Sequence, residues 1–221
     1  MKNIIILLGA FIFCSTGFSQ NEMTGNAPMH ILVFDRTPEE GYTGSPYVEE
    51  EFVKGTIVDS KGTNMEAWLR FNSVEDVVEV KVKEQDDKIY ELPRLKNISY
   101  KLNNYKYELD SFRTQDGELL EGYFIKYYEG DKIKFVAKPE PDIVRAEKAK
   151  TGYDEDKKAH LSVDIEYYLG VGDENRQEVR LKEKDFEKAL KSSPAVEKYL
   201  SDNKLKEAAD FQKFVEWYDQ Q

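Results

Sequence analysis

Few residues in this chain have the types and spacing that catalysis or metal binding requires. The 221 residues include two histidines, His30 and His160, and one cysteine, Cys14. Neither histidine lies in a recognisable nucleophile–base motif, and a zinc site would need ligands almost wholly from carboxylates, which is atypical. The glycine-rich loops that hold phosphates are also missing from the sequence. We therefore expect no metal or other cofactor.

Carboxylates are the abundant reactive groups. The chain has 43 Asp and Glu against 32 Lys and Arg, and its formal net charge is −11. A hydrolase of the glycosidase kind, which uses two acids across a cleft, stays open as an alternative, although no pair of acids stands out. So acidic a chain repels phosphate backbones and anionic lipid headgroups, which argues against binding to nucleic acid or to a membrane surface.

The first 19 residues have the layout of a secretory signal peptide. Lys2 precedes an apolar run over residues 4–13, and small residues occupy the −3 and −1 positions before Gln20. A lipoprotein anchor at Cys14 is the rival, but two bulky residues precede that cysteine. No later stretch approaches the length of a transmembrane helix. We predict export to the periplasm or the cell exterior, and the mature chain then has no cysteine for a disulfide.

The next segments indicate one β-rich domain. Residues 20–46 form a leader whose apolar burst at 31–34 adds at most one strand. Over residues 47–182, short runs rich in β-branched and aromatic residues alternate with turn residues about every eight to twelve positions. This spacing predicts an antiparallel meander that closes into a sandwich or an open barrel. Within it, residues 138–160 read as an extended charged loop.

Alternation of apolar and polar residues supports these strands. In "VVEVKVK", Val78, Val80 and Val82 are expected on the buried face, and Glu79 and the lysines on the wet one. Residues 161–170, "LSVDIEYYLG", alternate in the same way and predict another strand.

After residue 181 the apolar period changes from 2 to 3.6, which predicts three short helices in residues 183–221. Ser193 followed by Pro194 is a sound helix start, with a side-chain acceptor at the cap and proline at the first helical position. Helices this short are not stable alone, so they must dock on the sheet or on each other. The predicted fold class is α+β, mainly β, with a C-terminal helical appendage.

The stretch "EGYFIKYYEGDKIKFVAK", residues 121–138, interleaves aromatic and basic residues. We interpret it as a β-hairpin with a loop at 128–130, which pairs Ile125 with Ile133 and Tyr123 with Phe135 on one apolar face. Phe124 then falls on the charged face, where we expect a C-terminal helix to cover it. If it is bare, Phe124 is the first candidate for a partner contact.

Several stretches together resemble a group of uncharacterised secreted proteins of Bacteroidetes. They are "TGSPYVEEEFVKGTIVDSKG", "WLRFN", "KIYELP", "IEYYLG", "EVRLKEKDFEKAL" and "FVEWYDQ", together with the signal ending "GFSQ". The resemblance spans residues 42–218. It implies a β-rich exported envelope protein, and it transfers no active-site residues.

These observations favour a non-enzymatic exported protein of the cell envelope that is structural or binds a protein partner. A small-ligand module inside an open barrel is an alternative, with Trp68, Tyr90, Tyr123 and Tyr128 as wall residues. A carboxylate-dependent hydrolase is the second alternative. The sequence leaves the ligand, the partner and the oligomeric state open.

Overall fold

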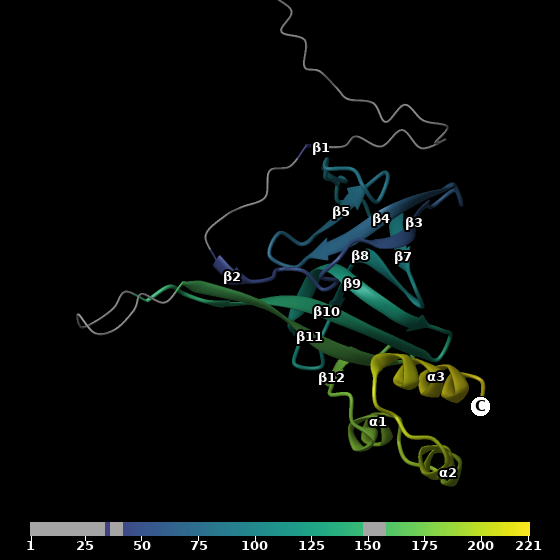
Figure 1. Cartoon of the computed structure of the whole chain (residues 1–221). Helices are drawn as coiled ribbons and strands as arrows, with labels where there is room; N and C mark the ends of the chain where they lie inside the picture. Colours follow the sequence, from purple (N-terminus) through teal and green to yellow (C-terminus); the bar gives the residue numbers. More distant parts are fainter. Residues whose placement is uncertain (1–33, 36–41, 148–157) are drawn as a thin grey trace, which may run out of the picture.

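The protein is described by a computed structural model, which covers residues 34–35, 42–147 and 158–221. The predicted signal peptide lies outside these residues. The chain is mainly β and forms one strongly curled mixed sheet, a half-barrel, followed by three C-terminal helices (Figure 1). This confirms the predicted fold class.

Twelve strands in the described residues belong to the one sheet. Their bounds are β1 Phe34–Asp35, β2 Tyr42–Gly44, β3 Val53–Asp59, β4 Asn64–Asn72, β5 Val77–Lys81, β6 Tyr90–Glu91, β7 Ile98–Leu102, β8 Tyr105–Arg113, β9 Leu119–Glu129, β10 Ile133–Val144, β11 Ala159–Val171 and β12 Gln177–Val179. Their order across the sheet is β1-β6-β5-β4-β3-β7-β8-β9-β10-β11-β12. These neighbours pair antiparallel, as a meander predicts, whereas β2 pairs with β11 in parallel.

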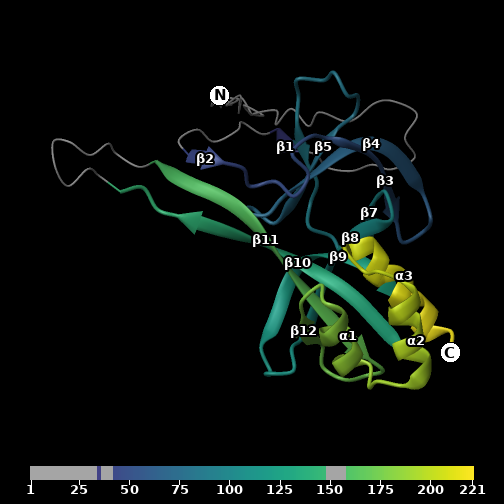
Figure 2. The same cartoon turned by 60° about the horizontal axis from the view of Figure 1, so that its bottom comes forward.

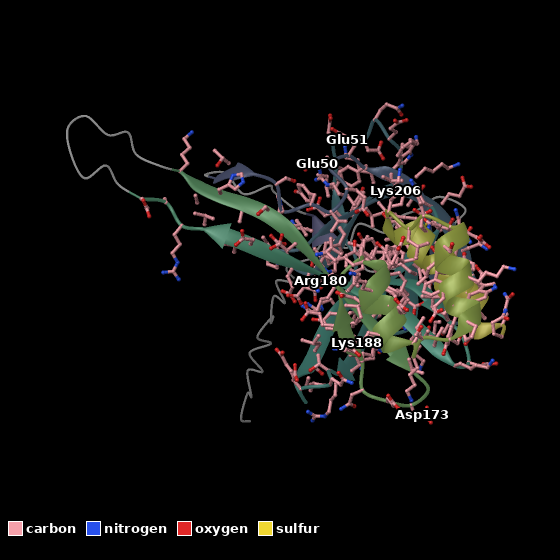
Figure 3. All side chains as sticks on the ribbon, turned by 90° about the horizontal axis from the view of Figure 1, so that it is seen from below. Glu50, Glu51, Asp173, Arg180, Lys188 and Lys206 are labelled. Carbon is pink, nitrogen blue, oxygen red and sulfur yellow. The ribbon has the colours of Figure 1, made fainter. Side chains whose placement is uncertain are left out.

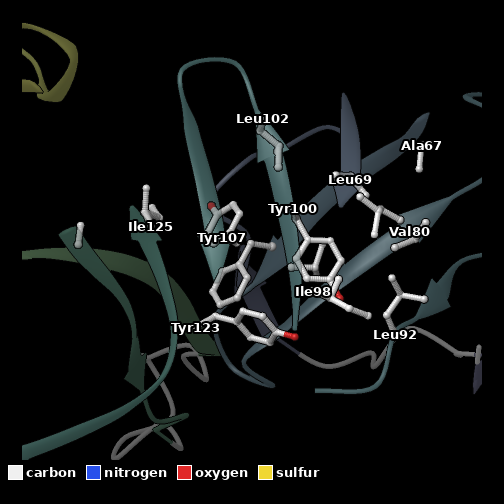
Figure 4. Close-up of a cluster of buried hydrophobic side chains, with 14 residues drawn as sticks. Ala67, Leu69, Val80, Leu92, Ile98, Tyr100, Leu102, Tyr107, Tyr123 and Ile125 are labelled. Carbon is white, nitrogen blue, oxygen red and sulfur yellow. The ribbon is translucent and has the colours of Figure 1, made fainter. Parts of the chain in front are cut away.

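The main core lies inside the curl of the sheet (Figure 4). Phe71 of β4 stacks on Tyr107 of β8 with 4.7 Å between ring centroids, and it meets the edge of Tyr123 on β9 at 6.1 Å. These strands are well separated in the sheet order, so the contacts can form only because the sheet bends back over its own face. Alternating side chains from both halves of the curl thereby fill one apolar interior.

A turn between β4 and β5 holds this curl closed. The Asp76 carboxylate accepts a hydrogen bond of 3.0 Å from the backbone N–H of Tyr123, on β9. At Gly122 the backbone has a φ of +134°, and a Cβ there would lie 2.7 Å from an Asp76 oxygen. Glycine is therefore required at this position, because a side chain would both strain the backbone and displace the turn.

The predicted three helices are present as α1 Glu183–Ala189, α2 Pro194–Asp202 and α3 Ala208–Asp219. Ser193 caps α2 as expected, because its Oγ accepts from the N–H of Val196 at 3.3 Å. In the part of the chain that the structure covers, no helix has the length and apolarity needed to cross a membrane.

Helices α1 and α3 pack against the sheet at one end of the half-barrel, and α2 packs on the other helices, with the Tyr199 ring 4.5 Å from that of Trp217 on α3 (Figure 1). Phe186 of α1 is fully buried and meets Phe135 of β10 edge-on at 5.3 Å and Phe211 of α3 at 4.5 Å. The Asp219 carboxylate at the end of α3 accepts from the Tyr128 hydroxyl at 2.9 Å and from the Lys132 N–H at 2.8 Å. The helices are thus docked on the sheet and on each other, as their short lengths required.

Two expected boundaries differ from the structure. Strand β10 continues to Val144 and β11 begins at Ala159, so both ends of the expected loop 138–160 are strand. The high charge of these residues suggested a loop, but cross-strand pairing holds them extended. The sheet also starts before residue 47, because β1 and β2 fall within the expected leader and pair with β6 and β11.

The expected faces of the "VVEVKVK" stretch are wrong at two positions. Val82, expected to be buried, follows the end of β5 and is 40 % exposed, and Glu79, expected on the wet face, is buried. Glu79 is only 1 % exposed, because an ion pair of 2.7 Å with Arg70 and a hydrogen bond of 3.3 Å from Asn72 compensate its burial. Tyr47, in the segment after β2, donates to the same carboxylate at 3.3 Å. The N-terminal segment therefore covers a face that alternation alone assigned to solvent.

In the β9–β10 hairpin the structure confirms the faces and corrects the register. Tyr123, Ile125, Ile133 and Phe135 are all buried in the two cores of the concave side. However, Phe135 pairs with Tyr128 and Val136 with Lys126, so β9 carries a bulge. The loop between the two strands begins after Glu129, whereas a loop over residues 128–130 was expected. The extra residue in β9 preserves the faces while shifting the pairing.

Candidate functional site

Strands β10 and β11 extend beyond the rest of the sheet as a long two-stranded ribbon (Figures 1 and 2). The last residue of β10 that pairs with β9 is Ala137. We call residues 138–144 of β10 and 159–166 of β11 the arm. Its two long edges differ in their capacity to bind another strand.

A groove of about 610 Å³ runs along the β11 edge of the arm. One wall is formed by residues of the segment 44–50, which follows β2, and the other by residues of 160–165 in β11. We call this the β11 groove. Figure 2 shows the two segments running next to each other.

Part of the β11 edge in this groove has no strand partner among the described residues. Residues 159–161 of β11 pair with β2, and residues 167–169 pair with β12. The Leu161 carbonyl accepts from the Ser45 N–H at 3.0 Å, so the backbone groups of Leu161 point toward the groove. Because these groups alternate in direction along a strand, the N–H and C=O of Val163 and Ile165 point the same way. They form a short row of hydrogen-bonding groups that faces the groove.

On the opposite edge of the arm, two prolines stand where donors would be needed. Pro139 pairs with Ile165 and Pro141 with Val163. The backbone groups of Val163 and Ile165 point away from β10, so the nitrogens of their partners point away from β11 toward the outer edge. Proline has no N–H, and this edge therefore cannot form a regular ladder with an added strand.

The wall of the groove formed by residues 44–50 is held by backbone hydrogen bonds between Val48 and Phe71 and between Ser73 and Pro46, and by one carboxylate, that of Glu49. Glu49 Oε1 accepts from the hydroxyls of Tyr105 at 2.6 Å and Tyr107 at 2.8 Å, and Oε2 accepts from the N–H of Phe71 at 3.1 Å. Burial, together with the charge of Glu49, raises the pKa of both tyrosine hydroxyls well above the usual value. Both hydroxyls therefore stay protonated as donors, and the wall is anchored to β4 and β8.

The polar side chains of the groove are occupied by neighbours that do not activate them. His160 Nδ1 lies 3.2 Å from Thr43 Oγ1, and that hydroxyl donates to the Ala159 carbonyl at 3.0 Å. Ser162 Oγ donates to Asp142 at 3.4 Å. Across the described ranges, no group of three or more His, Cys, Asp or Glu is arranged to hold a metal ion. The groove thus offers backbone groups and side chains for binding.

Phe124, predicted as a partner contact, is fully buried, and the expected cover by a helix is wrong. Its ring lies 4.8 Å from Phe112 of β8, and it also packs with Val136 and Tyr168. Side chains on β8, β10 and β11 cover Phe124 on the convex face of the sheet, while the helices pack against the opposite, concave side. Phe124 is therefore a core residue.

The other four predicted contact residues lie in different places, and none of them lines the β11 groove. Tyr123 is buried in the main core, and Tyr90 packs against the same core from β6. Tyr128 packs beside α3 and bonds Asp219, and Trp68 is half-buried on β4. Sequence reasoning chose residues by ring size, which selects core positions. The two prolines at 139 and 141 were the better signal, because they mark an edge strand.

The convex face also carries an ion cluster around Lys126, which is 9 % exposed. Its ammonium lies 3.0 Å from Glu108, 3.1 Å from Asp110 and 3.3 Å from Glu129. Burial alone would raise the pKa of the carboxyls of Glu108 and Asp110, but Lys126 and further polar neighbours outweigh it and lower both pKa values. Paired charges satisfy one another here, so the cluster is a structural element of the sheet.

No family model, curated protein or solved structure matches this chain. The choice of the β11 groove as the candidate site consequently rests on the geometry and charge of the described residues.

Proposed function

We propose that this chain is a non-enzymatic exported protein of the cell envelope, periplasmic or extracellular, that binds a protein partner through the β11 groove. The observation that carries the proposal is the open edge of β11 at Val163 and Ile165 inside an anchored groove. Exposed backbone groups along one wall recognise a polypeptide backbone. Small-molecule sites, in contrast, are usually enclosed and lined by a few converging polar side chains. The signal-peptide pattern of residues 1–19 supports export.

Photocrosslinking from inside the groove tests this proposal. A photoreactive phenylalanine analogue replaces Ser162, which lines the groove, and in a matched chain it replaces Lys188. Lys188 is exposed on α1, away from the arm (Figure 3). Irradiation of native envelope fractions is expected to give one defined protein adduct from position 162 and none from position 188. The adduct should disappear when Val163→Arg is added, because its side chain enters the groove. Absence of an adduct from position 162, or the same adducts from both positions, would refute the proposal.

A further inference from the structure

We infer that the partner enters the β11 groove as an added β-strand, and that this strand alternates basic and apolar side chains. The inference rests on the proposed function, because it specifies the chemistry of the segment that binds there. It follows from three features of the arm, namely the free backbone groups of β11, the side chains that flank them, and the blocked edge of β10.

The length of the free edge sets the length of the added strand. The slot between the last residue paired with β2 and the first residue paired with β12 is 162–166. At a rise of about 3.3 Å per residue, this slot is about 16 Å long and accommodates roughly five residues. Val163 and Ile165 each present one N–H and one C=O, so the added strand can form up to four ladder hydrogen bonds with the edge.

The side chains of the slot differ between its two faces. On one face, Val163 and Ile165 lie beside Val48 of the opposite wall, and Ile165 and Val48 also pack against the main core. On the other face lie Asp164 and Glu166. A matching strand therefore has apolar residues on the first face and basic residues on the second, since cross-strand pairs of opposite charge stabilise a sheet.

The charges around the slot strengthen this preference for basic residues. Glu140 of β10 pairs with Asp164, and Lys138 pairs with Glu166. The Lys138 ammonium is engaged by the Glu140 carboxylate, and Glu50 adds a further acid on the facing wall. The exposed Asp164 carboxylate forms no ion pair among the described residues, and the whole chain carries a net charge of −11. A basic segment is thus attracted both locally and at long range.

These features favour a separate basic partner over a second copy of this chain. The β10 edge of a second copy lacks the N–H groups of Pro139 and Pro141, so it cannot complete the ladder. The β11 edge of a second copy would place Asp164 and Glu166 against the same carboxylates, and like charges across strands are destabilising. Of the two edges of the arm, the β11 edge is therefore the one suited to a basic strand.

Binding of labelled synthetic peptides to the full chain tests the inference. The probe is the end-blocked peptide Lys-Val-Lys-Val-Lys, and Glu-Val-Glu-Val-Glu serves as its counterpart. We expect the basic peptide to bind at least about tenfold more tightly, from several favourable cross-strand pairs. Amide hydrogen exchange at Val163 and Ile165 should slow in the complex, because the ladder protects these N–H groups.

Two further probes separate a β-ladder from simple charge attraction. One peptide carries N-methyl groups on both valines, and the other carries them on all three lysines. If the strand adds antiparallel, methylation of the valines removes binding, because residues opposite Val163 and Ile165 bond directly to them. If it adds parallel, methylation of the lysines does so. Unchanged binding of both methylated peptides would overturn strand addition.

A pair of charge-reversal variants tests the side-chain pattern. Asp164→Lys lies in the slot, and Asp173→Lys makes the same change at an exposed turn outside it (Figure 3). Asp164→Lys is expected to reduce the preference for the basic peptide several-fold, because it removes one of the acids of the slot, whereas Asp173→Lys should keep the preference. Equal effects of the two variants would overturn the inference. So would a chain that forms dimers in sedimentation and loses them on Asp164→Lys, because the groove would then belong to a second copy.

The two proposals fail separately. Crosslinking from Ser162 reports a protein in the groove whatever its sequence, so an adduct combined with failed peptide tests would reject the basic strand and keep partner binding. Absence of the adduct would reject partner binding itself.

Discussion

Replacing Glu49 with alanine tests whether one carboxylate anchors the wall of the β11 groove. The change removes three hydrogen bonds, from the Tyr105 hydroxyl, the Tyr107 hydroxyl and the Phe71 N–H. Tyr107 is fully buried, so its hydroxyl loses its partner without access to water, whereas the partly exposed Tyr105 can bond to solvent. The variant therefore loses hydrogen bonds to a charged group and leaves one buried donor, the Tyr107 hydroxyl, without an acceptor.

The expected size follows from these contacts. Hydrogen bonds to a charged group contribute about 1.5–3 kcal/mol each, and a stranded buried hydroxyl costs about 1–3 kcal/mol. Because Glu49 is itself partly exposed and solvent compensates part of the loss, we expect Glu49→Ala to lower the free energy of unfolding by about 3 kcal/mol. For a chain of this size that corresponds to a fall in melting temperature of roughly 6–12 °C.

Urea unfolding followed by tryptophan fluorescence measures this loss, and Glu51→Ala is the matched control. Glu51 is the same residue type two positions away, exposed to solvent, and it lies near Glu50 on the same segment (Figure 3). Its removal should change the free energy of unfolding by less than about 0.5 kcal/mol. Amide exchange in residues 45–50 should also accelerate only in Glu49→Ala. Similar small losses in both variants would refute the anchoring role.

Three further predictions concern the sheet and its helices. Lys126→Met should lower the free energy of unfolding by about 2 kcal/mol near neutral pH, because it removes the cation that the carboxylates of Glu108 and Asp110 share and leaves them only Lys106 and the more distant Arg176. The pKa values of Glu108 and Asp110 are lowered in the folded state. The stabilisation by Lys126 is therefore present above the carboxyl pKa of the unfolded chain, and it is lost as the pH falls through the folded pKa values. Urea titrations at several pH values should show that the difference in stability between variant and wild type shrinks in acid. Phe186→Ala should cost about 4 kcal/mol by urea unfolding, since it empties a fully buried site between α1, α3 and β10. Replacing Pro139 and Pro141 together with valine should restore two N–H donors on the β10 edge, of which the one at the partly exposed position 141 can reach another chain, and should produce concentration-dependent association in sedimentation.

Matched variants separate these effects from general loss of structure. Lys101→Met changes an exposed lysine on β7 and should leave stability nearly unchanged at every pH. Phe186→Leu should cost clearly less than Phe186→Ala, because it keeps most of the buried volume. Association of the valine variant should fade when Ile143 on the same edge is replaced with lysine, which is the charge that natural edges carry. If the loss of stability in Lys126→Met did not depend on pH, the role of the Lys126 ion pairs would be contradicted. If the variant without the two prolines stayed monomeric, the blocking role of the prolines would be contradicted.

The elements of this chain follow from local patterns in its sequence. Period-2 alternation predicted β11 and placed Tyr123, Ile125, Ile133 and Phe135 on one buried face, and the structure confirms both. The change to a period of 3.6 after residue 181 predicted the three helices, including the cap at Ser193. These features are predictable because side-chain direction and capping depend on residues only a few positions apart.

Pairing between distant segments decided what local pattern could not. Alternation assigned Glu79 to the wet face, but Arg70 and the N-terminal segment cover it. It placed Phe124 on the charged face under an expected helix, but side chains of β8, β10 and β11 cover it instead. The bulge in β9 shifted the expected register without changing its faces.

The β11 groove likewise exists only in three dimensions. Residues 162–166 read as an ordinary strand in the sequence, and their free edge arises because β2 pairs before them and β12 after them. Whether a backbone group is free depends on which strand lies beside it, and that neighbour is set by the curl of the whole sheet. The sequence alone therefore determined the strands and helices, and the tertiary structure decided which edge of them is open to a partner.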